Sequence, residues 1–174
     1  CGPALASSLS KLADEHRHTV MPARAFGGHG GVTTFGLHCA TWLSSLVRDA
    51  DRLVELTCRP VAGELFGATG TMASLGSQGL LVQQRMMARL GLPEPLASAS
   101  GARDAAVEVV LYLALLVGTL GKAAQDISQL TWTEIGEAAE PAMGGRDTSS
   151  ALPHKANPTL STRAKNAADP LNTH

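Results

Sequence analysis

One helical stretch, residues 103–133, is apolar almost all round, and this feature limits most strongly what the chain can fold into. One face carries a regular series of apolar or small residues: Val107, Val110, Leu111, Ala114, Leu115 and Gly118. Further aliphatic residues fill the other sides: Val109, Leu113, Leu116 and Val117. A helix without a polar face is buried on every side. In a chain of 174 residues, this predicts packing against other subunits or against further parts of a longer polypeptide.

The composition of the whole chain leads to the same expectation. Hydrophobic residues make up 44% of the sequence and charged residues only 17%, whereas about a quarter of a typical soluble chain is charged. This is too little charge to cover the surface of an ordinary monomer. We therefore predict a homo-oligomer whose subunit interface covers apolar helix surface.

Helical spacing recurs along the chain, and no alternating strand pattern competes with it. The helical stretches cover residues 4–20, 37–56, 72–90 and 103–133, and Gly-, Pro- or Thr-rich segments separate them at 25–36, 63–70 and 93–101. Pro22 is expected to end the first helix and Pro93 to follow the third. The predicted fold class is all-α, a bundle of long helices.

Charge and cysteine content argue against several classes of function. A net charge of −1 offers no footprint for nucleic acid or an anionic membrane. The apolar run Val109–Leu120 has 12 residues, fewer than the ~20 needed to cross a bilayer. Cys1, Cys39 and Cys58 are an odd set without CxxC spacing, which predicts neither a disulfide framework nor a zinc site. No signal-peptide pattern is visible, so a cytoplasmic protein is expected.

The segment 148–158, Thr-Ser-Ser-Ala-Leu-Pro-His-Lys-Ala-Asn-Pro, concentrates groups that suit a carboxylate substrate. Lys155 and Asn157 can hold negatively charged oxygens, while a serine hydroxyl exchanges a proton with the adjacent carbon. From composition alone, a polar surface loop explains the same residues.

This segment resembles the signature G-S-S-x-M-P-x-K-x-N-P of the fumarase/aspartase superfamily. Ser149 aligns with the first serine of the signature, which implies that it is the catalytic acid or base. Ser150, Lys155 and Asn157 match further signature positions, and the resemblance implies that they bind substrate. Two positions differ, since Thr148 replaces the leading Gly and a Leu replaces the Met.

Other parts of the chain are similar to the same family in the same order. Residues 120–137 resemble the stretch just before the signature, and residues 66–76 resemble its Gly-rich turn. Residues 21–36 resemble G-R-T-H-G-x-H-A-x-P-T-T-F-G, which makes Arg24 and His29 candidate substrate-binding residues. A histidine satisfied within a loop is the alternative for His29.

Residues 25 and 26 indicate a branch of the family. Adenylosuccinate lyases carry Thr-His after the Arg, where this chain has Ala25 and Phe26. A Phe ring can neither transfer a proton nor hydrogen-bond a phosphate, so Phe26 favours the 3-carboxy-cis,cis-muconate cycloisomerases. Ser100 and Ala102 depart from the His and Gln expected in that branch.

The resemblance extends to Pro158 and implies a partial central helical domain over residues 1–158, with the signature loop at 144–158. Residues 159–174 form a divergent polar tail that Pro170 is expected to break, and the N- and C-terminal domains of the family lie outside these residues. The implied activity is lactone closure in aromatic catabolism (the beta-ketoadipate pathway), without metal or cofactor, in a homotetramer. A fumarate-releasing lyase similar to adenylosuccinate lyase and a truncated non-catalytic fragment are the alternatives.

Overall fold

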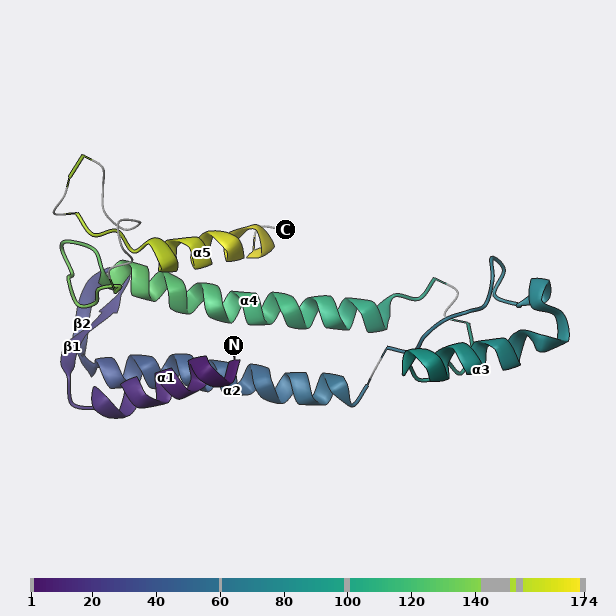
Figure 1. Ribbon diagram of the computed structural model, residues 1–174. Coiled ribbons are helices and arrows are strands. Elements are labelled where there is room, and N and C mark those ends of the chain that lie inside the picture. Colours follow the sequence, from purple (N-terminus) through teal and green to yellow (C-terminus); the bar gives the residue numbers. More distant parts are fainter. Residues whose placement is uncertain (1, 60, 99–100, 142–150, 153–154, 173–174) are drawn as a thin grey trace. The chain divides into compact units, whose positions relative to one another are not determined.

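Helices dominate the computed structural model, which confirms the all-α class (Figure 1). The structure describes residues 2–59, 61–98, 101–141, 151–152 and 155–172. The elements are α1 (Gly2–Glu15), β1 (Val20–Ala25), β2 (Gly28–Thr34), α2 (Phe35–Thr57), the 3₁₀ helix η1 (Ala73–Gln78), α3 (Gly79–Leu90), α4 (Asp104–Leu130) and α5 (Thr159–Asn172). They divide into one unit of Cys1–Ala50 with Ala114–His174 and a second unit of Asp51–Leu113.

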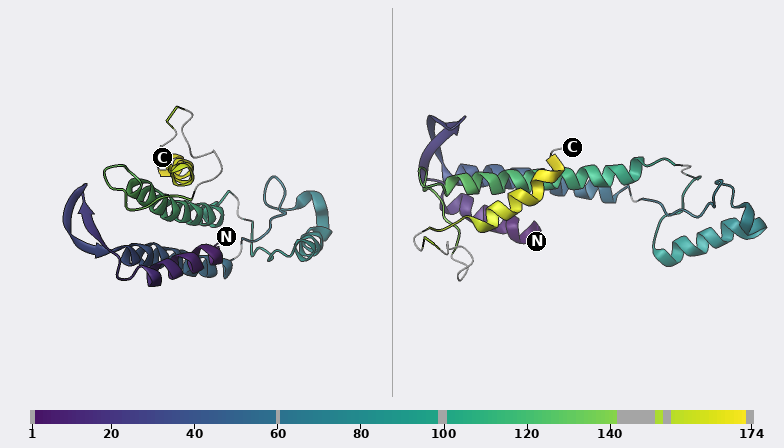
Figure 2. Two further views of the ribbon diagram at one scale, coloured as in Figure 1. Left: turned by 60° about the vertical axis from the view of Figure 1, so that its left-hand side comes forward. Right: turned by 90° about the horizontal axis from the view of Figure 1, so that it is seen from above.

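The core of the first unit lies where α1, the hairpin, α2 and the end of α4 meet (Figures 1 and 2). Its buried residues are Leu9, Met21, Cys39, Trp42 and Leu130. Gly36 allows α1 and α2 to approach closely, because a Cβ there would lie 2.6 Å from the carbonyl oxygen of Ala13. At the same junction Thr34 accepts a hydrogen bond from the Leu37 N–H at 3.2 Å and so caps the start of α2.

Residues 20–34 form an antiparallel hairpin, which corrects the expectations of a loop at 25–36 and of no strands. Val20 pairs with Thr34, and the register shifts between Ala23 and Arg24. Phe26 (φ 50°) and Gly27 (φ 78°) occupy the tip, the left-handed pair typical of a two-residue hairpin turn. The glycines of β2 hide the strand in the sequence, because glycine is depleted in strands.

Two helix boundaries also differ from expectation. The first helix ends at Glu15 rather than near residue 20, and Pro22 lies within β1. The tail is not broken by Pro170, since α5 continues to Asn172. Pro170 lies in the last turn of α5, so its missing N–H removes a single hydrogen bond, to the carbonyl four residues earlier.

Helix α4 packs closely on α5, because a Cβ on Gly121 would lie 2.6 Å from the Ala168 Cβ. Of the residues of α4, only Ala124 and Leu130 are buried. The described residues therefore do not bury α4 on all sides. By length and composition α4 could also cross a membrane, contrary to the expectation from the shorter run 109–120.

In the second unit, the expected single helix over 72–90 is two elements. The 3₁₀ helix η1 contains a kink at Gly76 (φ 54°, ψ −144°), and α3 follows it. Helix α3 ends before Pro93 as expected, and Gly91 caps it, since Gly91 is left-handed and donates its N–H to the Met87 carbonyl. Arg59 and Glu108 form an ion pair at 2.6 Å in this unit.

Candidate functional site

An arginine–carboxylate pair joins the hairpin to the segment that follows α4. Arg24 Nη1 donates to Glu137 Oε2 at 2.7 Å, and Nη2 donates to Oε1 at 2.6 Å. The chain reverses after α4 at Gly136 (φ 61°), and the N–H groups of Glu137 and Ala138 both reach the Leu130 carbonyl. Such a two-pronged pair fixes the orientation of both side chains. It therefore holds the hairpin tip in a defined place beside the end of α4.

The electrostatics of this pair keep both groups ionised. Hydrogen bonding from Arg24 holds the pKa of Glu137 below its ordinary value against the opposing effect of burial, and the positive potential of Arg24, His29 and His38 adds to the lowering. The hydrogen bond to Glu137 likewise raises the already high pKa of Arg24. The guanidinium fork of Arg24 is thus engaged by a protein carboxylate.

An open hollow of about 960 Å³ lies between the hairpin tip and the end of α4. Its lining residues are Arg24, Phe26, Gly27, His29, Gln129, Trp132, Glu134 and Ile135. His29 is the strand partner of Arg24, so the two predicted binding residues of the hairpin share this hollow. Phe26 is fully exposed and Trp132 is half exposed. The hollow therefore combines aromatic walls with a mixed polar side, where His29 and the paired Arg24 lie together with Gln129 and Glu134.

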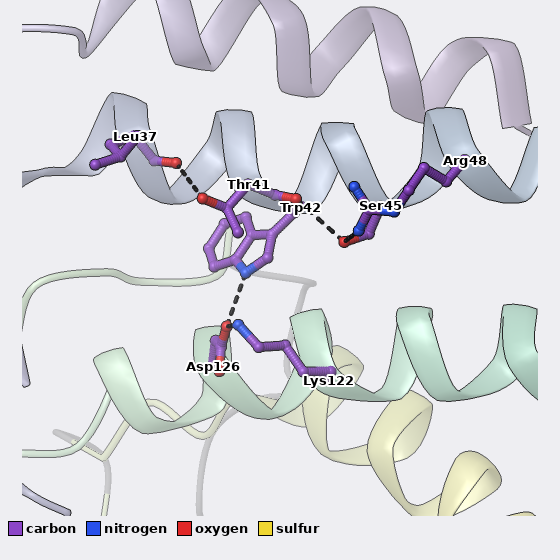
Figure 3. Close-up of polar contacts among 7 residues, drawn as sticks. All are labelled: Leu37, Thr41, Trp42, Ser45, Arg48, Lys122 and Asp126. Atoms are coloured by element: carbon purple, nitrogen blue, oxygen red, sulfur yellow. Dashed lines mark hydrogen bonds and ion pairs between the residues drawn. The ribbon is translucent and has the colours of Figure 1, made fainter. Parts of the chain in front are cut away.

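A partly buried hydrogen bond joins α2 to α4 (Figure 3). The indole N–H of Trp42 in α2 donates to Asp126 Oδ2 in α4 at 2.7 Å, and Lys122 donates to the same oxygen. Trp42 is 4% exposed and packs edge-on against Phe35. Because Asp126 precedes Gln129 by one helical turn, this contact also positions the wall of the hollow.

The residues of the signature segment that the structure describes lie just before α5. Lys155 is exposed, and its N–H bonds the Leu152 carbonyl at 3.0 Å. Asn157 is half-buried, and its carbonyl accepts the Thr159 N–H at 2.8 Å. Neither residue lines the hollow. Ser149 and Ser150 lie outside the described residues.

Glu140 was not expected as a site residue, yet it contacts the start of α5. Its Oε2 accepts the Leu160 N–H at 2.9 Å, and its Oε1 accepts the Ser161 N–H at 2.7 Å and the Ser161 hydroxyl at 2.5 Å. Burial favours a higher pKa for Glu140, but these hydrogen bonds outweigh burial and lower the pKa. Glu137 and Trp132 were missed in the same way. The sequence does contain one pattern that could have indicated these glutamates, a Glu at every third position (134, 137 and 140).

Metal-binding clusters are not found in the described part of the chain, where no three His, Cys, Asp or Glu side chains converge on a common point. Cys39 and Cys58 are free thiols.

A family model described as a lyase matches residues 3–168. The chain is 41% identical to a 3-carboxy-cis,cis-muconate cycloisomerase of Bradyrhizobium diazoefficiens, over 92% of this chain and 36% of that protein. It is 39% identical to an adenylosuccinate lyase of Pyrococcus abyssi, over 88% of this chain and 34% of that protein. A crystal structure of 3-carboxy-cis,cis-muconate lactonizing enzyme from Pseudomonas putida matches with a TM-score of 0.85 and 34% identity, over 97% of this chain and 36% of that one.

The chain spans about a third of the length of these relatives. The matched residues include the hairpin with Arg24, the end of α4 and the start of α5, which are the elements that build the candidate site. This chain belongs to the lyase family of the fumarase/aspartase superfamily.

Proposed function

We propose that this chain contributes part of the active site of an enzyme that closes 3-carboxy-cis,cis-muconate to a lactone. The observation that carries the proposal is the hairpin tip, where Phe26 presents an apolar ring to the hollow that also contains His29. Aromatic walls suit the flat conjugated carbon chain of a muconate, and a ring N–H of His29 can donate a hydrogen bond to one of its carboxylates. The similarity to two proteins of this activity supports the same choice.

The reaction needs one proton and no net redox change. A carboxylate oxygen of the substrate bonds to one alkene carbon, and the displaced π electrons move to the neighbouring carbon. That carbon takes a proton from Ser149, which regains a proton from solvent water, so the product, counted as its free acid, is an isomer of the substrate. Lys155 and Asn157 would stabilise the negative charge that builds up on the adjacent carboxylate before protonation.

Within this proposal, Arg24 orients the hairpin and does not clamp the substrate with its fork, because both prongs are engaged by Glu137. His29 remains the substrate-facing group of the hairpin. Ser149 rather than Ser150 transfers the proton, and Ser150 is a substrate-binding residue.

The proposal extends to assembly. The exposed aliphatic residues of α4, such as Val110 at 61% and Leu111 at 58%, would be covered by other copies of the chain in a soluble homo-oligomer. Sedimentation equilibrium of the purified protein tests this point, and a well-folded monomer at micromolar concentration would contradict it.

A substrate panel on the full-length protein tests the activity. We expect loss of the conjugated-diene absorbance of 3-carboxymuconate and no fumarate release from adenylosuccinate. Adenylosuccinate cleavage is the second candidate, favoured by the similarity to the Pyrococcus abyssi lyase. Turnover of adenylosuccinate alone would select it and reject lactone closure.

A further inference from the structure

The start of α5 needs an acceptor from elsewhere in the chain. Helix N-termini leave their first backbone N–H groups without intrahelical partners. In α5 the Pro158 carbonyl accepts the first helical bond, from the Thr162 N–H at 2.9 Å. Pro158 therefore occupies the capping position, but its side chain carries no acceptor. The N–H groups of Thr159, Leu160 and Ser161 must find other partners.

Each of these three donors has a partner. The Thr159 N–H bonds the Asn157 carbonyl at 2.8 Å. The other two reach the two oxygens of Glu140, at 2.9 Å for Leu160 and 2.7 Å for Ser161. A capping side chain ordinarily bonds these same second and third N–H groups, but from the residue directly before the helix. Here Glu140 does so from about 20 residues upstream, and its negative charge also suits the positive end of the helix dipole.

We propose that Glu140 is a positioning residue for Asn157 and Lys155. By holding the first turn of α5, Glu140 fixes the Thr159 N–H, which in turn holds the Asn157 carbonyl. Asn157 is half-buried and Lys155 precedes it by two residues, so the orientation of both depends on where α5 begins. This inference rests on the proposed function, because it concerns how that site holds its carboxylate.

The hairpin is anchored on the same short segment. Glu137 forms an ion pair with Arg24, and Glu140 accepts hydrogen bonds from Ser161. The two carboxylates are three residues apart in the chain. The segment between α4 and residue 141 therefore fixes both the hairpin tip and the start of α5. A shift of about 1 Å in a positioned group can cost about 100-fold in rate, so a displacement of this segment should lower the rate as well as the stability.

Four variants of the full-length protein test the inference. Glu140→Ala removes all three hydrogen bonds, and kcat/KM should fall by about 10- to 100-fold, mainly through kcat. Glu140→Gln keeps its length and one acceptor oxygen, but its amide faces a backbone donor, so an intermediate loss is expected. Ser161→Ala loses only the hydroxyl contact and should lose the least. Glu15→Gln, an exposed glutamate at the end of α1, is the charge-matched control and should match wild type.

Hydrogen exchange at the Leu160 and Ser161 amides and binding of citrate, an unreactive tricarboxylate probe, do not require turnover. Exchange should accelerate in Glu140→Ala, and citrate binding should weaken by about two- to threefold, much less than kcat falls, with Glu140→Gln between this variant and wild type. Should Glu140→Ala fail to fold, the Glu140→Gln and Ser161→Ala variants carry the test.

Faster exchange with unchanged kcat/KM and citrate affinity in the assembled protein would reduce Glu140 to a structural cap and overturn the inference. If wild type is inactive on 3-carboxymuconate but binds citrate, and Glu140→Ala binds citrate more weakly, the proposed function is wrong and the inference about Glu140 holds. Absence of both activity and citrate binding in wild type would overturn both.

Discussion

The hairpin tip and the start of α5 are held by the same kind of group in different ways. At the hairpin, Glu137 meets the side chain of Arg24, so the contact depends on two ionised side chains. At α5, Glu140 meets two backbone N–H groups and one hydroxyl, so the contact depends on where the helix begins. The first contact can be lost by substitution at either end, whereas the second can be fully lost only at Glu140.

From this difference we expect the hairpin and the start of α5 to have different roles in the site. The hairpin presents recognition groups, Phe26 and His29, on a strand ladder that Arg24 orients. The start of α5 presents Asn157, which belongs to the same signature segment as the serine that the sequence predicts to transfer the proton. Changes at the hairpin should therefore act mainly on KM, and changes on the α5 side mainly on kcat.

The largest expected effect is that of Ser149→Ala on turnover. A positioned general acid contributes about 10²–10⁴-fold, so kcat should fall by that factor while citrate affinity stays within a few-fold. Ser150→Ala should be milder. Steady-state kinetics with size-exclusion chromatography measures both. If Ser150→Ala abolished turnover and Ser149→Ala did not, the alignment of the signature would be displaced by one residue.

Breaking the hairpin anchor should have the next largest effect. Arg24→Lys keeps the charge but cannot bond both oxygens of Glu137, and we expect KM for 3-carboxymuconate to rise by about tenfold with little change in kcat. Glu137→Gln should raise KM similarly, and the double variant should be no worse than either single one. Additive losses would show that Arg24 contacts the substrate independently of Glu137.

The prediction for Ser149 follows from the sequence alone, whereas the prediction for Arg24 and Glu137 needs the structure. The helices could be predicted from the sequence, because apolar periodicity is a local signal. The chemistry of residues 149–157 stays a prediction from a long ordered motif, which is also a local signal. The hairpin could not, since Gly28, Gly30 and Gly31 disguise β2. The partners of Glu137 and Glu140 could not either. Each contact joins residues far apart in the chain, and nothing local to the glutamates identifies Arg24 or Ser161 as the partner.

The pH dependence of stability tests the contribution of each carboxylate, Glu137 and Glu140, separately. The pKa values of Glu137 and Glu140 are both lowered in the folded protein. Each group therefore contributes stability that is fully present above the ordinary glutamate range, about pH 4, and is lost as pH falls through the lower folded value. The melting temperature of wild type should drop across this acidic window, and Glu137→Gln and Glu140→Gln should each show a shallower drop. An unchanged slope in either variant would mean that its carboxylate is not stabilised in the folded state.

The smallest effect on stability, and the sharpest test of recognition, is expected at Phe26. Among the described residues, Phe26 and Met72 are the non-glycine residues with positive φ. Met72 is 8% exposed, so packing offsets its strain, whereas the fully exposed Phe26 ring gains nothing comparable from the described residues. Strain uncompensated by packing is typical of a functional position.

Phe26→Asn places at the tip a residue that adopts the left-handed region more readily, so the free energy of unfolding should change by less than about 1 kcal/mol. If the ring forms a wall of the substrate site, KM for 3-carboxymuconate should rise several-fold. Val32→Thr is the matched control, because it removes exposed apolar surface from the same hairpin without lining the hollow. An equal rise in KM for both variants would assign the effect to the hairpin as a whole. An unchanged KM in Phe26→Asn would remove the aromatic wall from the argument for a muconate, and the case for lactone closure would then stand on similarity alone.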